Sequence, residues 1–181
     1  FGVKTRRTST EGSITQFERE FVRPNPGRTL IVGSRVTDDK EDRRKRYADV
    51  VGVDAIDGPG VDVVMNMEAP QDIGVFRHVE CTSVLEHCER PWLVAEAIEK
   101  MMEPGCTIFV SVPFVWRQHG YPKDYWRMTP DAIRLIFPSI KWLHLVYAAN
   151  EILDDARIDS VLRDGHRYFA RTEVAGFGVK A

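Results

Sequence analysis

The feature that most constrains the fold is a series of short apolar segments, each ending at a glycine or a polar residue. The first two cover residues 29–33 and 50–54 and end at Gly33 and Asp54. Short apolar runs of this kind are typical of strands buried on both faces of a parallel sheet. Further strands are predicted along the chain, at residues 61–65, 79–84, 107–112, 142–148 and 168–179.

Helical patterns alternate with these strands, which predicts an α/β fold with a parallel sheet and helices on both faces. The clearest helix begins at Pro91, a favoured first helical residue, and a second begins at Thr129, which can cap it. The apolar stripe of the first helix consists of Val94, Ala97, Ile98 and Met101. Further helices are predicted at residues 13–22, within 38–46 and at 70–76, and residues 150–166 are expected to be irregular.

Composition argues against several classes of function. The 181 residues carry a formal net charge of −2, so the chain has no general attraction to nucleic acids or anionic membranes. No apolar run is long enough to span a membrane, and the N-terminus lacks an apolar signal region. The three cysteines form no CxxC pair, which favours free thiols and a cytoplasmic protein. They are Cys81, Cys88 and Cys106.

Four chemically informative residues directly follow predicted strands. Gly33 would let a ligand approach the backbone closely, and Asp54 stands 21 positions later. An acid about 20 residues after a glycine turn suits recognition of ribose hydroxyls in a doubly wound nucleotide site. Asn66 and Ser83 follow the next two strands, and ligands bind at the carboxyl ends of such strands. These residues predict a nucleotide-like ligand, and the alternative is an ordinary α/β core with a surface aspartate.

Six short pieces of the sequence also keep the order and spacing of a known family. They read Leu-Ile-Val-Gly-Ser-Arg at 30–35, Val-Gly-Val-Asp at 51–54, Val-Asp-Val-Val at 61–64, Ser-Val-Leu-Glu-His at 83–87, Met-Glu-Pro-Gly at 102–105 and Ser-Val-Pro at 111–113. Together they resemble the class I S-adenosylmethionine-dependent methyltransferases, most closely the small members with a Leu-Glu-His element. The resemblance implies a three-layer, Rossmann-like methyltransferase fold of about seven strands with an antiparallel last strand. Residues 1–27 would form an arm and helix ahead of one domain over residues 28–181.

The resemblance implies S-adenosyl-L-methionine as the cofactor and assigns contacts to the first two strand ends. Gly33, with the backbone of Ser34 and Arg35, would lie under the methionyl part of the cofactor. Asp54 would accept hydrogen bonds from the ribose hydroxyls. The chain departs from the family pattern here, because only one glycine remains in the loop, and Arg35 and Val36 stand where small residues are expected.

Later strand ends would complete the cofactor site. Asn66 would face the adenine amino group, with Met67 beside it. The family commonly has an acid at this position, and an amide can still accept through its carbonyl oxygen. The remaining implied contacts are those of Ser83 and Val84 near the sulfonium and of Glu86 and His87 at the rim.

The aromatic-rich loop over residues 114–127 is the predicted site for a methyl acceptor. His119 is the candidate base, because the pKa of an imidazole lies near working pH. Arg127, with Arg117 and Lys123, would hold an anionic group. The predicted pocket walls are Trp116, Tyr121 and Tyr125.

Each of these residues also has a purely structural interpretation. His119 fits a turn residue, His87 fits an orienting role, and the aromatic side chains fit a cap on the sheet edge. Asp124 and Arg127, three positions apart, fit a local ion pair that pins the loop. The basic residues at 43–46 fit phosphate binding or, more simply, a solvated helix face.

The predicted function is methyl transfer from S-adenosylmethionine to a small-molecule acceptor. One alternative is a non-catalytic binding module, which the depleted glycine loop suggests. Another is a nicotinamide-dependent oxidoreductase, but the sequence lacks the G-x-G-x-x-G that pyrophosphate binding needs. No metal site is predicted, because there is no HExxH motif and no ligand spacing among His78, His144 and His166.

Overall fold

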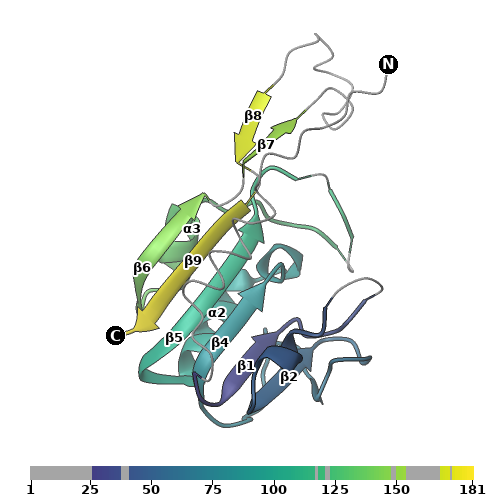
Figure 1. The fold of residues 1–181 in the computed structure, drawn as a ribbon, viewed down its shortest axis with the longest axis vertical. Helices are drawn as coiled ribbons and strands as arrows, with labels where there is room; N and C mark the ends of the chain where they lie inside the picture. The colour runs from purple at the N-terminus through teal and green to yellow at the C-terminus, as the bar shows by residue number, and fades with distance from the viewer. Residues whose placement is uncertain are drawn as a thin grey trace.

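A seven-stranded sheet in the order β3-β2-β1-β4-β5-β9-β6 forms the centre of the molecule (Figure 1). The computed structural model describes residues 26–37, 41–116, 118–120, 123–147, 150–153, 168–171 and 173–181. The strands of the sheet are β1 (Thr29–Val32), β2 (Val50–Asp54), β3 (Val63–Val64), β4 (Phe76–Thr82), β5 (Met102–Pro113), β6 (Ile140–Tyr147) and β9 (Glu173–Lys180).

The directions of the strands confirm the predicted fold class. The first five strands in the chain pair in parallel with their neighbours. β9 is antiparallel to both β5 and β6, so β6 runs in the same direction as β5. The strand order reverses between β1 and β4, which is where doubly wound sheets bind their ligands.

Helices α2 (Pro91–Lys100) and α3 (Pro130–Ile136) lie together behind the sheet in Figure 1. Pro91 occupies the start of α2 as predicted, and Thr129 caps α3 by accepting a hydrogen bond from the backbone of Ala132. The predicted stripe of α2 is buried and shares one apolar core with Val79 and Cys81 of β4. The core therefore lies between these two helices and the central strands. None of the described helices has the length and apolar character needed to cross a membrane.

The opposite face of β4 carries buried polar side chains instead. Glu80 is 0 % exposed and accepts a hydrogen bond from the hydroxyl of Tyr47, which follows the short 3-10 helix η1 (Arg43–Arg46). Nη1 of Arg43 lies 3.6 Å from Oε2 of Glu80 and donates to the hydroxyl of Thr82 at 2.6 Å. Because these residues alternate with the core side of β4, η1 forms part of a third layer.

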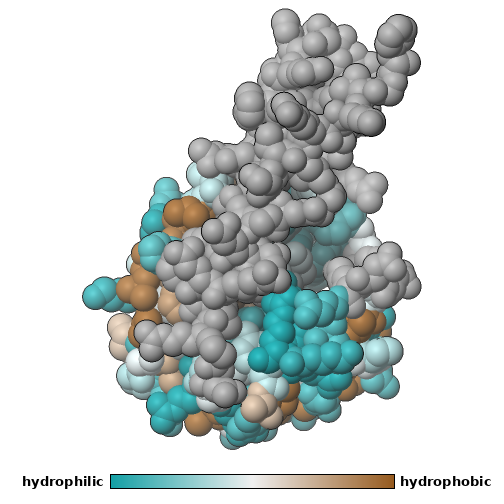
Figure 2. Space-filling model, in the orientation of Figure 1, coloured by the Kyte–Doolittle hydropathy of each residue, from teal (hydrophilic) through white to brown (hydrophobic). Residues whose placement is uncertain are grey.

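The three arginines of η1 form ion pairs, which favours the structural interpretation of the basic cluster at 43–46. Arg44 contacts both Asp42 and Asp62, and Arg46 contacts Glu41. Figure 2 shows a strongly hydrophilic surface over this part of the molecule. These contacts hold η1 on β2 and β4, and the described contacts give no support to phosphate binding there. Of the helix predicted within 38–46, the structure describes residues 41–46, and only four of them are helical.

Two of the predicted elements are wrong in the described residues. Residues 70–75 form no helix, because the Asp72 carboxylate accepts a hydrogen bond from the Gly74 backbone at 2.9 Å and Gly74 has φ +89°. Residues 150–153, expected to be irregular, form strand β7 (Asn150–Leu153), which pairs antiparallel with β8 (Tyr168–Arg171). The helix predicted at 13–22 lies outside the described residues.

Glycines in β9 serve packing rather than merely weakening the strand. A Cβ atom built on Gly176 would lie 2.7 Å from both Leu145 and Trp142 of the neighbouring β6. The chain therefore needs glycine where these two large side chains cross β9.

Candidate active site

The loop after β1 is tied to the end of β2. The backbone N–H groups of Gly33 and Ser34 both donate to the carbonyl oxygen of Val53, at 2.9 and 3.0 Å. Gly33 has φ +74°, and a Cβ atom there would lie 2.3 Å from Cγ2 of Val84, just beyond β4. Gly33, Asp54 and Val84 are therefore brought together at the reversal of strand order, as the sequence predicts.

The same loop folds against the turn that follows β2. The backbone N–H of Val36 donates to the carbonyl of Pro59 at 2.7 Å. A Cβ on Gly60, which has φ +88°, would lie 2.6 Å from the backbone oxygen of Ser34, and one on Gly58 would lie 3.0 Å from Cδ of Arg35. Gly58 and Gly60, after β2, thus leave room for Arg35 and Val36, which stand after β1 where small residues are expected.

This packing limits what the loop offers to a ligand. The N–H groups of Gly33, Ser34, Arg35 and Val36 all donate within the protein. The Ser34 side chain is buried, and a Cβ on Gly52 would meet its Oγ at 2.6 Å, so this hydroxyl points toward β2. The loop therefore supplies a surface for a ligand rather than backbone donors.

Asp54 retains acceptor capacity at the end of β2. Its Oδ1 accepts from the backbone of Ile56 at 3.0 Å and its Oδ2 from that of Arg35 at 3.3 Å. Each carboxylate oxygen has a second lone pair, and the residue is half-buried, so two ribose hydroxyls can be accepted there. The acceptor capacity of Asp54 therefore fits the ribose hydroxyls of an adenosyl cofactor.

Asn66 and Met67 occupy the turn after β3. Oδ1 of Asn66 accepts from the backbone of Glu68 at 2.9 Å, and the side chain is exposed. That oxygen keeps one lone pair for an amino group. Met67 is buried and belongs to the apolar core, so its side chain offers an apolar contact and no polar one.

Ser83 marks the end of β4 with a strained backbone. Its φ of +52° is the one positive value of a non-glycine residue within the described part of the chain. Its N–H donates to the carbonyl of Ser111 at 2.9 Å, which fixes this conformation to β5. Such strain is common at functional sites, and Ser83 is exposed at the strand end.

The loop between β5 and α3 is fastened to the 3-10 helix η2 (Leu85–His87), which follows Val84. The backbone N–H of Tyr125 donates to the carbonyl of Glu86 at 2.7 Å. The Trp126 indole donates to the carbonyl of Cys88 at 2.8 Å. Nδ1 of His87 lies 2.6 Å from the carbonyl oxygen of Lys123, and since a carbonyl only accepts, this nitrogen carries the proton. These contacts hold the predicted acceptor loop over the end of β4.

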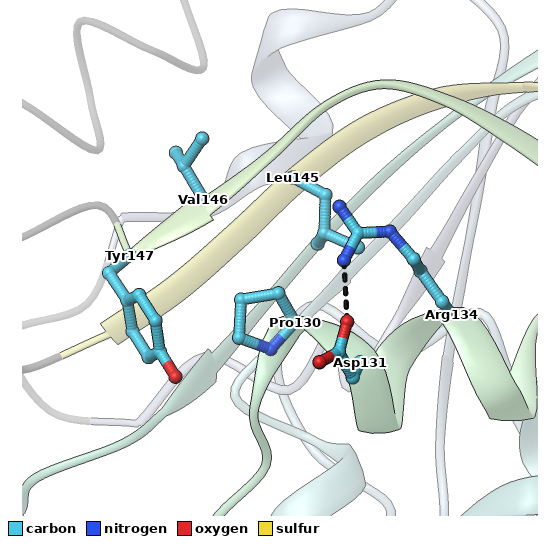
Figure 3. Close-up of a pocket in the computed structure, with 6 residues that line it drawn as sticks. All are labelled: Pro130, Asp131, Arg134, Leu145, Val146 and Tyr147. Carbon is cyan, nitrogen blue, oxygen red and sulfur yellow. Dashed lines mark hydrogen bonds and ion pairs between the residues drawn. The ribbon is translucent and has the colours of Figure 1, made fainter.

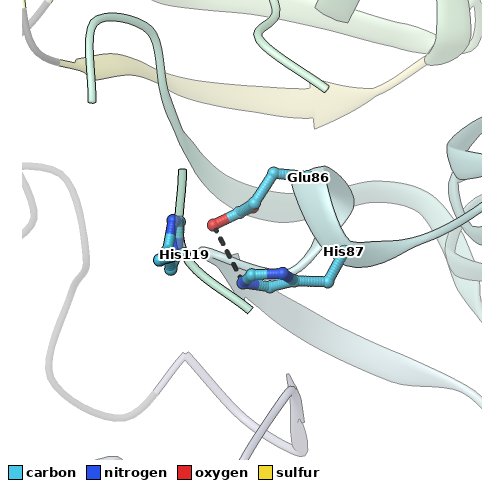
Figure 4. Close-up of side chains that lie close together, drawn as sticks. All are labelled: Glu86, His87 and His119. Carbon is cyan, nitrogen blue, oxygen red and sulfur yellow. Dashed lines mark ion pairs between the residues drawn. The ribbon is translucent and has the colours of Figure 1, made fainter. Parts of the chain in front are cut away.

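Glu86 lies inside this junction and not at the rim, which corrects the expectation from the sequence. It is 1 % exposed, and neither carboxylate oxygen has a hydrogen-bond partner among the described residues. Its Oε1 lies 3.6 Å from Nε2 of His87 (Figure 4). Burial raises the pKa of Glu86 to about 7, and the nearby Asp124 charge acts in the same direction.

The predicted ion pair of the loop is present. Arg127 grips the Asp124 carboxylate with two hydrogen bonds of 2.5 and 2.6 Å, and the Asp124 side chain is 2 % exposed. The Arg127 guanidinium holds the pKa of Asp124 well below its usual range. The same carboxylate lies 3.1 Å from Nδ1 of His119 and accepts from the His119 backbone at 2.9 Å. Asp124 therefore orients the imidazole of His119.

An open pocket of about 540 Å³ borders this loop. Trp116 and Tyr125 are 46 % and 41 % exposed, and the hydroxyl of Tyr125 donates to Glu89 at 2.8 Å. Tyr121 and Arg117, also predicted here, lie outside the described residues. The lining consists of Gln118, His119, Gly120, Lys123, Asp124 and Tyr125.

A second pocket, of about 470 Å³, lies between the start of α3 and the end of β6 (Figure 3). An ion pair of 2.8 Å joins Asp131 and Arg134 along one side of it. None of the residues predicted for cofactor or acceptor lines this pocket.

The geometry moves Glu86 from the rim to the interior of the site and adds Asp124 to the candidate site residues. The Leu-Glu-His sequence gives no local signal of burial. Glu86 is buried because the loop between β5 and α3 folds over η2. The local signal for Asp124 was its spacing from Arg127. That spacing predicts the ion pair but not the contact with His119.

The arrangement of the sheet is that of the class I S-adenosylmethionine-dependent methyltransferase fold. A S-adenosylmethionine-dependent methyltransferase from Clostridium acetobutylicum is similar with a TM-score of 0.61 at 6 % identity, over 97 % of this chain and 93 % of that chain. The Burkholderia thailandensis 1,6-didemethyltoxoflavin-N1-methyltransferase, with bound 1,6-didemethyltoxoflavin and S-adenosylhomocysteine, gives 0.59 at 12 % identity, over 97 % and 77 %. The [4+2]-cyclase SpnF gives 0.60 at 11 % identity, over 92 % and 80 %. No protein-family model matches the sequence, and no curated protein sequence matches it either.

Proposed function

We propose that this protein transfers a methyl group from S-adenosyl-L-methionine to a small-molecule acceptor. The observation that carries the proposal is the meeting of Gly33, Asp54 and Val84 at the reversal of strand order. This is the place where doubly wound sheets bind nucleotide ligands. The fold shared with known methyltransferases supports the cofactor, although fold alone does not define a reaction.

The strand ends divide the work of holding the cofactor. Asp54 would accept hydrogen bonds from the ribose hydroxyls, and the surface of Gly33, Ser34 and Arg35 would support the methionyl part. The adenine would lie between Asn66, through its carbonyl oxygen, and Met67. When bound, S-adenosylmethionine supplies an electrophilic methyl group on a sulfonium. Ser83 and Val84 would lie near that group, with His87 at the rim.

The acceptor would bind in the pocket beside η2. Trp116, Tyr121 and Tyr125 would form its walls. Lys123, which lines the pocket, would hold an anionic part of the acceptor, because the predicted Arg127 is bound to Asp124. The protein aligns the acceptor with the methyl group, which is the main requirement of an in-line displacement. His119, the candidate base, would receive the acceptor proton. The pocket volume of about 540 Å³ favours a small molecule.

Isothermal titration with S-adenosylmethionine and S-adenosylhomocysteine tests the proposal. Asp54→Asn, at the carboxyl end of β2, should weaken binding about tenfold or more, because a charged acceptor of two hydroxyl hydrogen bonds is lost. Asp49→Asn, just before the amino end of the same strand, is the matched control and should bind like the unmodified protein. A folded protein that binds neither compound would contradict the proposal.

A non-catalytic binding module is the second candidate, and one observation favours it. The backbone N–H groups of the loop after β1 are all used within the protein, so the cofactor would gain no donors there. SpnF, which has a similar fold, is named for a different reaction. Binding of S-adenosylhomocysteine without methyl transfer to amine, hydroxyl or carboxylate acceptors would favour this candidate.

The nicotinamide-dependent oxidoreductase has less support. Pyrophosphate binding needs backbone donors in the first loop, and these are already engaged. Fluorescence titration with NADH distinguishes the two nucleotides, because tight NADH binding that S-adenosylhomocysteine does not displace would favour the oxidoreductase.

A further inference from the structure

Glu86, His87 and His119 point toward one another at the junction of η2 and the acceptor loop (Figure 4). Each offers one oxygen or nitrogen atom, and these atoms all lie within 4.8 Å of one another. Donor atoms around a first-row metal ion stand about 3–3.5 Å apart when each bond to the metal is about 2.0–2.2 Å. Oε1 of Glu86 and Nε2 of His87, at 3.6 Å, are already close to that spacing.

Both histidines are oriented as metal ligands commonly are. The Nδ1 of His87 faces the carbonyl oxygen of Lys123 at 2.6 Å, and the Nδ1 of His119 faces the carboxylate of Asp124 at 3.1 Å. Metal-ligating histidines typically donate their other ring N–H to a carbonyl or a carboxylate. Each ring therefore presents Nε2 as its ligating atom, and the two rings stand edge to face with their centroids 4.9 Å apart.

Glu86 gives an independent reason for a cation at this place. Its side chain is 1 % exposed, and both oxygens lack hydrogen-bond partners within the described residues. A buried carboxylate without such partners is costly, and metal coordination is one of the few arrangements that compensates for this cost. The Arg127 charge favours the ionised form of Glu86, but its two short hydrogen bonds go to Asp124, and no hydrogen bond to Glu86 is found among the described residues.

We propose that Glu86, His87 and His119 bind a divalent transition-metal ion. Two imidazoles and one carboxylate suit Zn²⁺, Fe²⁺ or Co²⁺, whereas Mg²⁺ and Ca²⁺ prefer oxygen ligands. Three protein ligands leave coordination positions open toward the pocket that His119 lines. A hydroxyl of the acceptor bound to the ion would lose its proton more easily, so the ion would direct transfer to oxygen. This last step rests on the proposed methyl transfer, whereas metal binding does not.

Titration of the chelator-treated full chain with Co²⁺ and Zn²⁺, without cofactor, tests the site. We expect one ion per chain, a visible Co²⁺ absorption typical of nitrogen and oxygen ligands, and no displacement by Mg²⁺. His119→Gln and Glu86→Gln should each weaken Co²⁺ binding by about tenfold or more. His144→Gln, a histidine change on the distant strand β6, is the matched control and should bind like the unmodified protein.

Circular dichroism of each variant keeps the test interpretable. If Glu86→Gln fails to fold, the His119→Gln variant decides the test. His119 is half-exposed on a surface loop, so we expect its replacement to leave the fold intact. Absence of Co²⁺ binding by the folded protein, or equal binding by His119→Gln and His144→Gln, would overturn the metal site. Neither result affects binding of S-adenosylhomocysteine, so failure of the metal site and failure of the proposed function are distinguished.

Discussion

Gly33 and Val84 meet so closely that a methyl group added to Gly33 would lie 2.3 Å from Cγ2 of Val84. Gly33 follows β1 and Val84 follows β4, and these two strands flank the reversal of strand order. The contact therefore joins the two halves of the sheet at the candidate site.

Gly33→Ala should lower the free energy of unfolding by about 2 kcal/mol or more, because it combines a positive φ with overpacking. Adding Val84→Ala should remove the clash but not the backbone strain. The double variant should therefore be more stable than the sum of the single changes predicts, by about 1 kcal/mol. Urea unfolding measures all three variants, and additive effects would show that the two residues do not touch.

The Arg127–Asp124 pair should contribute far more to stability than a second pair with the same spacing. Arg127→Gln leaves the Asp124 carboxylate, 2 % exposed, without its partner and should cost about 2–3 kcal/mol. Arg134→Gln breaks an equivalent pair with Asp131, whose side chain is 92 % exposed, and should cost about 0.5 kcal/mol or less. Thermal and urea unfolding measure both, and equal costs would show that Asp124 is not buried in solution.

Local signals in the sequence were sufficient for much of the fold. The ends of β1 and β2, the start of α2 and the cap of α3 all depend on residues within a few positions of one another. The Asp124–Arg127 pair was predictable for the same reason. Short-range spacing determines these features, so a single sequence reveals them.

Features that depend on distant segments were not predictable. Glu86 is buried because the loop after β5 folds back over η2, and nothing within residues 83–87 signals this. Arg35 and Val36 stand where small residues are expected, and the distant Gly58 and Gly60 provide the space that they need. From the sequence, Gly176 is expected to weaken its strand. In the structure, two side chains of β6 pack so closely on it that only glycine fits.

Two glycine variants separate steric crowding from backbone strain. Gly176→Ala places a methyl group 2.7 Å from Trp142 and Leu145 in the core and should cost about 2–3 kcal/mol through overpacking. Gly105→Ala meets no atom within 4 Å but has φ +82°, so it should cost about 1 kcal/mol through backbone strain alone. Chemical unfolding of both variants measures the difference. A larger cost for Gly105→Ala would show that β6 does not pack on β9 as described.

His78 should make the protein sensitive to mild acid. It is buried on the polar face of β4, with Nδ1 2.8 Å from the hydroxyl of Thr107 on β5, and the ring of Tyr47 lies 5.8 Å away. Burial lowers the pKa of His78 from 6.5 to about 4. Between these values the unfolded chain binds a proton that the folded chain excludes, so the free energy of unfolding falls as pH decreases from about 6.5 toward 4. The loss attributable to His78 amounts to about 3 kcal/mol over this range.

His78→Gln removes the titrating group while keeping a polar side chain beside Thr107. Glu80, two positions along the same face, is a further ionisable group, so the measured quantity is the difference between the variant and the unmodified protein. Urea unfolding at a series of pH values from 7.5 to 4.5 measures this difference. The upper limit is about one unit above the pKa of the unfolded chain, and the lower limit is about half a unit above that of the folded chain. The curve of His78→Gln should be flatter by most of the His78 contribution. Parallel curves would show that the pKa of His78 is the same in the folded and unfolded chains. They would contradict burial of a neutral His78 in β4.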